Sequence, residues 1–139
     1  MNIDSIVNGV VIDHITAGKA MTLYELLGLS SLENPVAIIQ RAGSRKMGSK
    51  DIIKIDGKTE VDLDVIGYVD PGATVNIIKN GKLAEKKEID LPLTLSGVLH
   101  CKNPRCITST EQELKHVFRL TDRESKTYRC IYCETAAEK

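Results

Sequence analysis

Four cysteines are the residues of this chain best suited to specific chemistry, and they occur as two closely spaced pairs near its C-terminal end. The pairs are Cys101 with Cys106 and Cys130 with Cys133, separated by a stretch of 23 residues. Two short-spaced cysteine pairs are typical of a tetrahedral zinc site built from two knuckles. Two disulfides, or four unrelated buried cysteines, are the less favoured alternatives, because the cytoplasm expected below keeps thiols reduced. We therefore expect one zinc ion per chain, bound by these four residues.

The expected zinc ion is structural. Four cysteine ligands complete the coordination sphere and leave no position for water or substrate. A segment of about 45 residues buries little apolar surface, so metal binding should supply much of its folding free energy. His100 directly precedes Cys101, and we interpret it as a strand residue entering the knuckle and not as a ligand. His116 is assigned no function.

Charge and composition exclude several other functions. Lysine plus arginine and aspartate plus glutamate both number 19, so the chain has no net charge to attract nucleic acid or an anionic membrane. It has no tryptophan and one phenylalanine, which is a poor supply of rings for stacking on bases. No nucleophile with its base, paired-carboxylate motif or glycine-rich phosphate loop is recognisable, so we expect a non-catalytic chain.

The N-terminal residues favour a cytoplasmic location. The first twenty carry Asp4, Asp13 and His14, and they lack both a basic start and a long apolar run. Neither a signal peptide nor a membrane helix fits this pattern.

The predicted strands and helices divide the chain into two parts. Short β-branched runs predict five strands, at Val10–Ile15, Val36–Arg41, Ile52–Asp56, Thr74–Lys79 and Leu83–Ile89. Asn80-Gly81 predicts a hairpin between the last two. Apolar spacing predicts a helix over Ala20–Leu27, closed by Gly28. A second helix at Glu60–Val69 is ambiguous with a strand, and the turn Asp70-Pro71-Gly72 ends it in either case.

The sequence pattern changes at Leu91-Pro92-Leu93, and we expect a domain boundary there. The strand series ends there, and all four cysteines follow. Beyond it, Leu114, His116, Phe118 and Leu120 alternate as in a strand, with a turn at Thr121–Ser125. We predict an α+β fold: residues 1–91 form an antiparallel five-stranded sheet with two helices, ferredoxin-like, and residues 92–139 form a small all-β zinc domain, rubredoxin- or zinc-ribbon-like.

Five segments, in this order and at these separations, resemble the regulatory chain of aspartate carbamoyltransferase over nearly the whole length. They are Gly9-Val-Val-Ile-Asp-His-Ile15, Met47-Gly-Ser-Lys-Asp-Ile-Ile-Lys-Ile55, Ala73-Thr-Val-Asn76, Val98-Leu-His-Cys-Lys-Asn-Pro-Arg-Cys-Ile107 and Cys130-Ile-Tyr-Cys-Glu134. Each segment alone is a weak signal, but five in register are highly specific.

The resemblance implies that the N-terminal domain binds ATP as an activator and CTP, with UTP, as feedback inhibitors. The residues implied are His14, Lys54 and Lys86 at the phosphates and ribose, Asp13 at the ribose, and Val11, Asn76 and Ile78 at the base. Cationic side chains suit a triphosphate. Main-chain groups around Ile3 to Ile6 are also implied to contact the nucleotide. A one-residue register shift would exchange Lys86 for Lys87.

The resemblance also implies partners. Regulatory chains pair as homodimers through the nucleotide domain, and three such dimers bridge two catalytic trimers, which the zinc domain contacts. The alternative function is a zinc-ribbon module that binds nucleic acid, since the C-terminal segment is locally basic. Its basic residues are Lys102, Arg105, Arg119, Arg123, Lys126 and Arg129. Neutral overall charge and scarce aromatic residues argue against this alternative.

Overall fold

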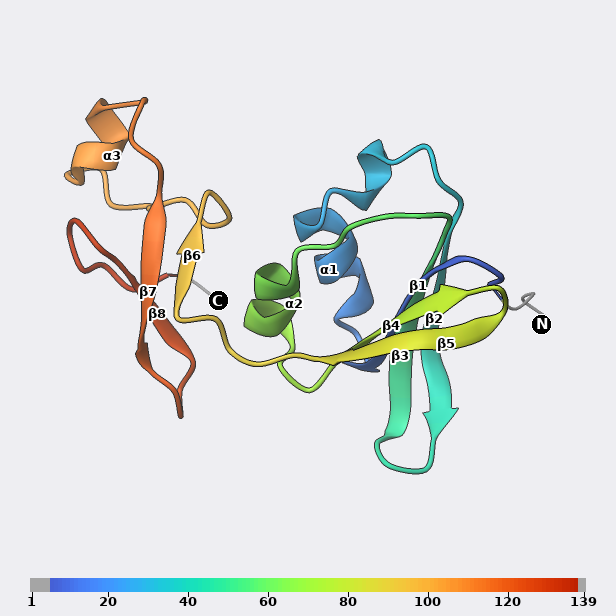
Figure 1. Cartoon of the computed structure of the whole chain (residues 1–139). Helices are drawn as coiled ribbons and strands as arrows, with labels where there is room; N and C mark the ends of the chain where they lie inside the picture. The colour runs from blue at the N-terminus through green and yellow to red at the C-terminus, as the bar shows by residue number, and fades with distance from the viewer. Residues whose placement is uncertain (1–5, 138–139) are drawn as a thin grey trace. The chain divides into compact units, whose positions relative to one another are not determined.

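We obtained a computed structural model of the chain, which describes residues 6–137. The chain forms two compact units, Met1–Asp90 and Leu91–Lys139 (Figure 1). Most of the segment expected to contact a nucleotide with its main chain, Ile3 to Ser5, lies outside the described residues. No helix among the described residues is long and apolar enough to cross a membrane.

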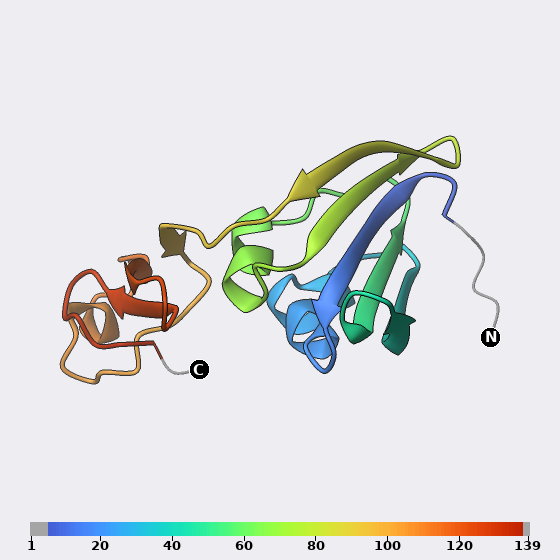
Figure 2. The same cartoon turned by 90° about the horizontal axis from the view of Figure 1, so that it is seen from below.

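The first unit is a five-stranded antiparallel sheet with two helices on one face, and the predicted fold class is confirmed. Its elements are β1 (Gly9–Thr16), α1 (Ala20–Leu26), a 3-10 turn η1 (Leu29–Ser31), β2 (Val36–Ser44), β3 (Gly48–Asp56), α2 (Leu63–Val69), β4 (Thr74–Lys79) and β5 (Lys82–Glu88). The strand order is β2-β3-β1-β4-β5. Figures 1 and 2 show both helices on the same side of this sheet.

The core lies between the helices and one face of the sheet. Alternate residues of the central strands, such as Val10 and Ile12 on β1 and Ile53 on β3, are buried against Leu23 of α1 and Ile66 of α2. The opposite face carries the remaining strand residues and no helix of this unit. Within this unit, one face of the sheet is therefore not covered by a helix.

The turns confirm the local predictions. Asn80 and Gly81 have φ angles of 54° and 75°, as the two central positions of a type I′ hairpin require. Gly28 has φ 66° and ends α1. Helix α2 begins at Leu63, where the Asp62 side chain accepts a hydrogen bond from the backbone N–H of Asp64. The ambiguous segment Glu60–Val69 is therefore helical only from Leu63.

The second unit is a small three-stranded sheet with one helical turn. It comprises β6 (Thr94–Ser96), α3 (Ile107–Thr110), β7 (Val117–Asp122) and β8 (Thr127–Cys130), with strand order β6-β7-β8. Leu95, Phe118 and Tyr128 form its buried centre. The predicted strand that included Leu114 and His116 was too long at its start, because both residues precede β7.

Candidate functional site

A row of four side chains crosses the open face of the N-terminal sheet. Val11 on β1 lies opposite Lys54 on β3 and opposite Asn76 on β4, and Asn76 lies opposite Lys86 on β5. Opposed residues of an antiparallel pair project to the same face. Ile12, the next residue along β1, is fully buried on the helix side, so the row lies on the other face. Two lysines thus flank an apolar side chain and an amide.

Asn76 carries an unsatisfied acceptor in the middle of this row. Its Oδ1 is buried and, within the part of the chain described, has no hydrogen-bond partner. Leaving a buried polar atom unpaired costs about 1 to 3 kcal/mol, so such an atom in a native fold calls for an explanation. A ligand that donates a hydrogen bond on the open face would satisfy it. Ile78, two residues along β4, shares this face and is half-buried.

Asp13 and His14 come together at a β-bulge at the end of this face. The register of β1 against β3 pairs Ile12 with Ile53 and Ile15 with Asp51, so Asp13 and His14 together oppose one residue. His14 has φ 56°. The strand therefore bends here, and the backbone N–H of His14 donates to Asp13 Oδ1 at 2.6 Å. The Nδ1 of His14 lies 3.2 Å from the Oγ1 of Thr74.

Lys50 belongs to the same group, although the sequence prediction omitted it. Its Nζ lies 2.9 Å from Asp13 Oδ1, and its side chain is only 17% exposed. Burial raises the pKa of Asp13, but hydrogen bonds from Lys50 and from the His14 amide, with the charge of Lys50, outweigh burial and hold that pKa below its usual 3.8. Lys50 lies four residues before Lys54 on the same strand, and this even spacing is the signal that would have identified it.

Asp51 holds the backbone behind the site. Its fully buried carboxylate accepts hydrogen bonds from the backbone N–H groups of Gly18, Ala20 and Arg41, at 2.9, 3.1 and 2.9 Å. Arg41 has φ 59° and lies in a second bulge, in β2. One carboxylate therefore joins the start of α1 to the irregular part of β2, next to Lys50.

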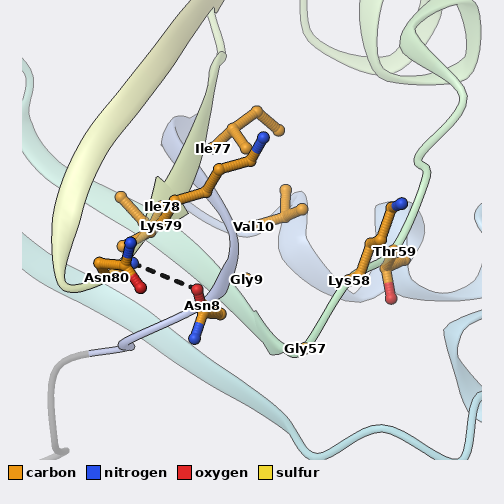
Figure 3. Close-up of a pocket in the computed structure, with 10 residues that line it drawn as sticks. All are labelled: Asn8, Gly9, Val10, Gly57, Lys58, Thr59, Ile77, Ile78, Lys79 and Asn80. Atoms are coloured by element: carbon orange, nitrogen blue, oxygen red, sulfur yellow. Dashed lines mark hydrogen bonds between the residues drawn. The ribbon is translucent and has the colours of Figure 1, made fainter.

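A cavity of about 400 Å³ lies at the other end of the first unit (Figure 3). It is lined by Asn8, Gly9, Val10, Gly57, Lys58, Thr59, Ile77, Ile78, Lys79 and Asn80. The backbone N–H of Asn80 donates to Asn8 Oδ1 at 3.2 Å across its edge. Among the predicted nucleotide-binding residues, only Ile78 borders it. The cavity and the cross-strand row are therefore separate features.

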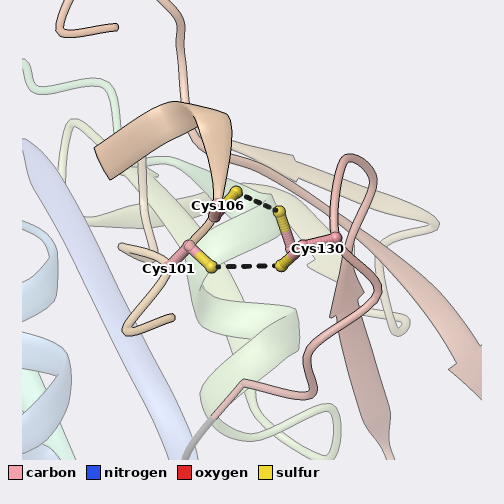
Figure 4. Close-up of side chains that lie close together, drawn as sticks. Cys101, Cys106 and Cys130 are labelled. Atoms are coloured by element: carbon pink, nitrogen blue, oxygen red, sulfur yellow. Dashed lines mark hydrogen bonds between the residues drawn. The ribbon is translucent and has the colours of Figure 1, made fainter. Parts of the chain in front are cut away.

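The four cysteines of the second unit form a group that could hold a metal ion. Figure 4 labels three of them, Cys101, Cys106 and Cys130. The four sulfur atoms all lie within 4.8 Å of one another. The distances are 3.6 Å from Cys101 to Cys133 and 3.7 Å from Cys106 to Cys130. A zinc ion about 2.3 Å from each sulfur of a tetrahedron would set the sulfurs about 3.8 Å apart, whereas a disulfide needs about 2.05 Å. The donor set and its spacing fit a tetrahedral metal.

Hydrogen bonds with neighbouring threonines lower the pKa of two of these thiols, which favours the thiolate form that binds a metal. The Thr108 hydroxyl donates to the Cys106 sulfur at 3.1 Å, and this bond lowers the pKa of Cys106. Hydrogen bonds with Thr135 lower the pKa of Cys133 to about 6. Burial raises the pKa of Cys101 to about 12. Because thiolates are the metal ligands, metal binding must release the protons that these thiols carry.

His116 has a structural role that the sequence did not indicate. Its Nδ1 accepts a hydrogen bond from the backbone N–H of Cys101 at 2.9 Å, which fixes the first knuckle. The ring of His100 packs against that of His116 with the centroids 4.9 Å apart. The four-residue cluster that could hold a metal ion consists of cysteines, and neither histidine belongs to it.

Both halves of the chain match a known protein family. Residues 1–90 match the family described as the aspartate carbamoyltransferase regulatory chain, allosteric domain, and residues 94–139 match the metal binding domain of the same chain. An aspartate carbamoyltransferase regulatory chain of Clostridium botulinum is 46% identical over 134 residues, which cover 96% of this chain and 92% of the relative. One of Bifidobacterium longum is 43% identical over 138 residues, 99% of both chains. The chain therefore belongs to the family of aspartate carbamoyltransferase regulatory chains and is a regulatory, non-catalytic subunit.

Proposed function

We propose that the open face of the N-terminal sheet binds nucleoside triphosphates and that this binding regulates the first committed step of pyrimidine biosynthesis in the cytoplasm. The ligands proposed are ATP as activator and CTP, with UTP, as inhibitors. The observation that supports this most directly is the row across four strands, in which Lys54 and Lys86 flank the unpaired Oδ1 of Asn76. Cations suit phosphates, and a base or ribose can donate the hydrogen bond that Asn76 lacks.

Each residue of the row, and three residues next to it on the same face, have a proposed role. Lys54 and Lys86 neutralise the phosphates, and His14, at the bulge at the end of this face, also contacts the phosphates or the ribose. Asp13, ionised by its contact with Lys50, accepts hydrogen bonds from the ribose hydroxyls. Val11 and Ile78 give the base an apolar surface on which to lie, and Asn76 reads one of its edges.

The second unit is proposed to hold one structural zinc ion and to contact the catalytic chain. Residues 1–91 would then act as the sensor and residues 92–139 as the docking domain. Several large apolar side chains of the second unit are exposed, namely Leu93, Ile107, Ile131 and Tyr132. Such surface is available to a partner. In the proposed assembly, homodimers of regulatory chains bridge catalytic trimers.

Regulation in this assembly must pass between polypeptides. Because the nucleotide and the substrates bind to different chains, a nucleotide can change the rate only by binding two quaternary states with different affinities. The effect of a nucleotide on rate therefore requires an intact zinc domain, whereas nucleotide binding does not.

One reconstitution tests the proposal. The chain is mixed with its catalytic partner, assembly is followed by size, and carbamoyltransferase activity is measured with ATP, CTP and UTP. We expect assembly and nucleotide-dependent rates. A chain that does not assemble, or an assembled enzyme that ignores all three nucleotides, would contradict it. Mobility-shift assays at two salt concentrations test the alternative, since nucleic-acid binding weakens steeply with salt.

A further inference from the structure

A second buried carboxylate, that of Asp70, holds the end of β1 that follows the Asp13–His14 bulge and the turn that leads into β4. Asp70 follows α2 and is only 5% exposed. Its Oδ2 accepts a hydrogen bond from the backbone N–H of Thr16 at 2.5 Å, and its Oδ1 accepts one from the backbone N–H of Gly72 at 3.2 Å. The two oxygen atoms therefore contact two different segments of the chain.

Both segments are close to His14, one along the chain and the other through a side-chain contact. Thr16 ends β1 two residues after His14. Gly72 lies in the turn that leads into β4, and the first residue of β4, Thr74, places its Oγ1 3.2 Å from the Nδ1 of His14. The position of the His14 ring depends on the backbone of β1 and on the start of β4. The Asp70 carboxylate is hydrogen-bonded both to the end of β1 and to the turn before β4.

The backbone at His14 needs such support. A φ of 56° is unusual for a residue with a side chain, and such a conformation persists only where the surroundings enforce it. Asp70 is itself fixed, since its N–H donates to the Ile66 carbonyl at 2.8 Å and its carbonyl accepts from the Ala73 N–H at 3.1 Å. A carboxylate whose backbone is fixed just after α2 thus anchors the strained end of β1.

We propose that Asp70 is a positioning residue for nucleotide binding, which acts by holding His14 in its productive orientation. The inference rests on the proposed function, in which His14 contacts the nucleotide. Asp70 lies buried behind the bulge and has no role in contacting the ligand itself. Its substitution should therefore weaken binding only where His14 is present.

A double-mutant cycle tests this on the full chain. The affinities of CTP and ATP are measured by calorimetry for the wild type, Asp70→Ala, His14→Ala and the double variant. We expect Asp70→Ala to weaken binding about tenfold in the wild type and less than about twofold in the His14→Ala background. Asp64→Asn removes an exposed carboxylate from the neighbouring helix α2 and should change neither affinity.

The double-mutant cycle distinguishes a failure of the proposed function from a failure of the positioning role. If the wild type bound neither nucleotide, the proposed function would be wrong, and this inference with it. If the wild type bound but Asp70→Ala bound equally well, or weakened both backgrounds tenfold, the positioning role alone would be wrong. Asp70→Asn keeps one oxygen that can accept from Thr16, and it should lose less affinity than the alanine variant. It replaces that variant in the cycle if Asp70→Ala does not fold.

Discussion

Lys86 lies directly opposite Asn76 across the β4–β5 pair, whereas Lys87 lies opposite Val75. Val75 is fully buried on the helix side of the sheet. The two adjacent lysines therefore project to opposite faces, and only Lys86 shares a face with Val11 and Asn76. The ambiguity between these lysines in the sequence depends on one residue of register, which the strand pairing fixes.

Lys86→Ala should weaken the binding of CTP and ATP by about tenfold to a hundredfold, because it removes a charge-assisted contact worth about 1.5 to 3 kcal/mol. Lys87→Ala should leave both affinities within about twofold. Lys79→Ala is a second control, since Lys79 borders the separate cavity. Calorimetry on the three variants decides. Equal losses for Lys86→Ala and Lys87→Ala would show that the open face is not the binding surface.

Cys130→Ser should abolish stoichiometric metal binding and separate the chain from its catalytic partner. Cys130 is buried among the other three thiols, and a unit this small depends on its metal to fold. Nucleotide affinity should stay within about twofold, because the first unit has its own core. Metal analysis is expected to give about one zinc per wild-type chain. Normal assembly of the Cys130→Ser chain would exclude the zinc domain as the docking surface.

Lys50→Met should raise the pKa of Asp13. Lys50 stabilises the ionised carboxylate, so without it the burial of Asp13 is less opposed. Because the pKa of Asp13 in the folded chain lies below 3.8, its contribution to stability is present above that pH and is lost as the pH falls through the folded pKa. Carbon-detected NMR titration of Asp13 measures the change. An unchanged pKa in Lys50→Met would mean that the contact is not maintained in solution.

Asp51→Ala should destabilise the first unit strongly. It leaves three backbone N–H groups without their acceptor, of which that of Ala20 is buried and those of Gly18 and Arg41 are partly buried. Each lost hydrogen bond contributes about 1 kcal/mol, so a total of about 3 kcal/mol is expected. Glu60→Ala, at an exposed position, should change stability by less than about 0.5 kcal/mol. Denaturant unfolding of both variants provides the comparison. Similar unfolding midpoints for Asp51→Ala and Glu60→Ala would show that Asp51 does not stabilise the first unit in the way proposed.

Local patterns in the sequence were enough to predict most of the fold. The β-branched runs, the Asn80-Gly81 turn and the apolar spacing of α1 each have a strong short-range cause. Helix α2 was ambiguous because Val61, Leu63 and Val65 also alternate with period two, and packing decided the outcome: Val65 and Ile66 are both buried, which suits a helix and not a strand. Strand β6 and helix α3 are too short to carry a periodic signal.

The candidate site was less accessible from the sequence, because it depends on how distant strands align. The cysteine cluster was predictable, since its spacing is local. The cross-strand row depends on the pairing of β1 with β3 and β4, which no local pattern specifies. The bulge at Asp13 and His14 inserts a residue that alternation cannot indicate. The turn at Asp70 was predicted, but the contact of its carboxylate with Thr16 joins residues 54 positions apart.

An NMR titration of the isotope-labelled chain with CTP would locate the nucleotide-binding surface directly. Two surfaces of the first unit compete as binding sites, the row on the open face and the cavity lined by Asn8, Lys58 and Lys79. If CTP binds the open face, the largest amide shift changes occur at Val11, Asp13, His14, Lys54, Asn76 and Lys86. Changes confined to the residues around the cavity, or no changes at millimolar CTP, would contradict binding to the open face.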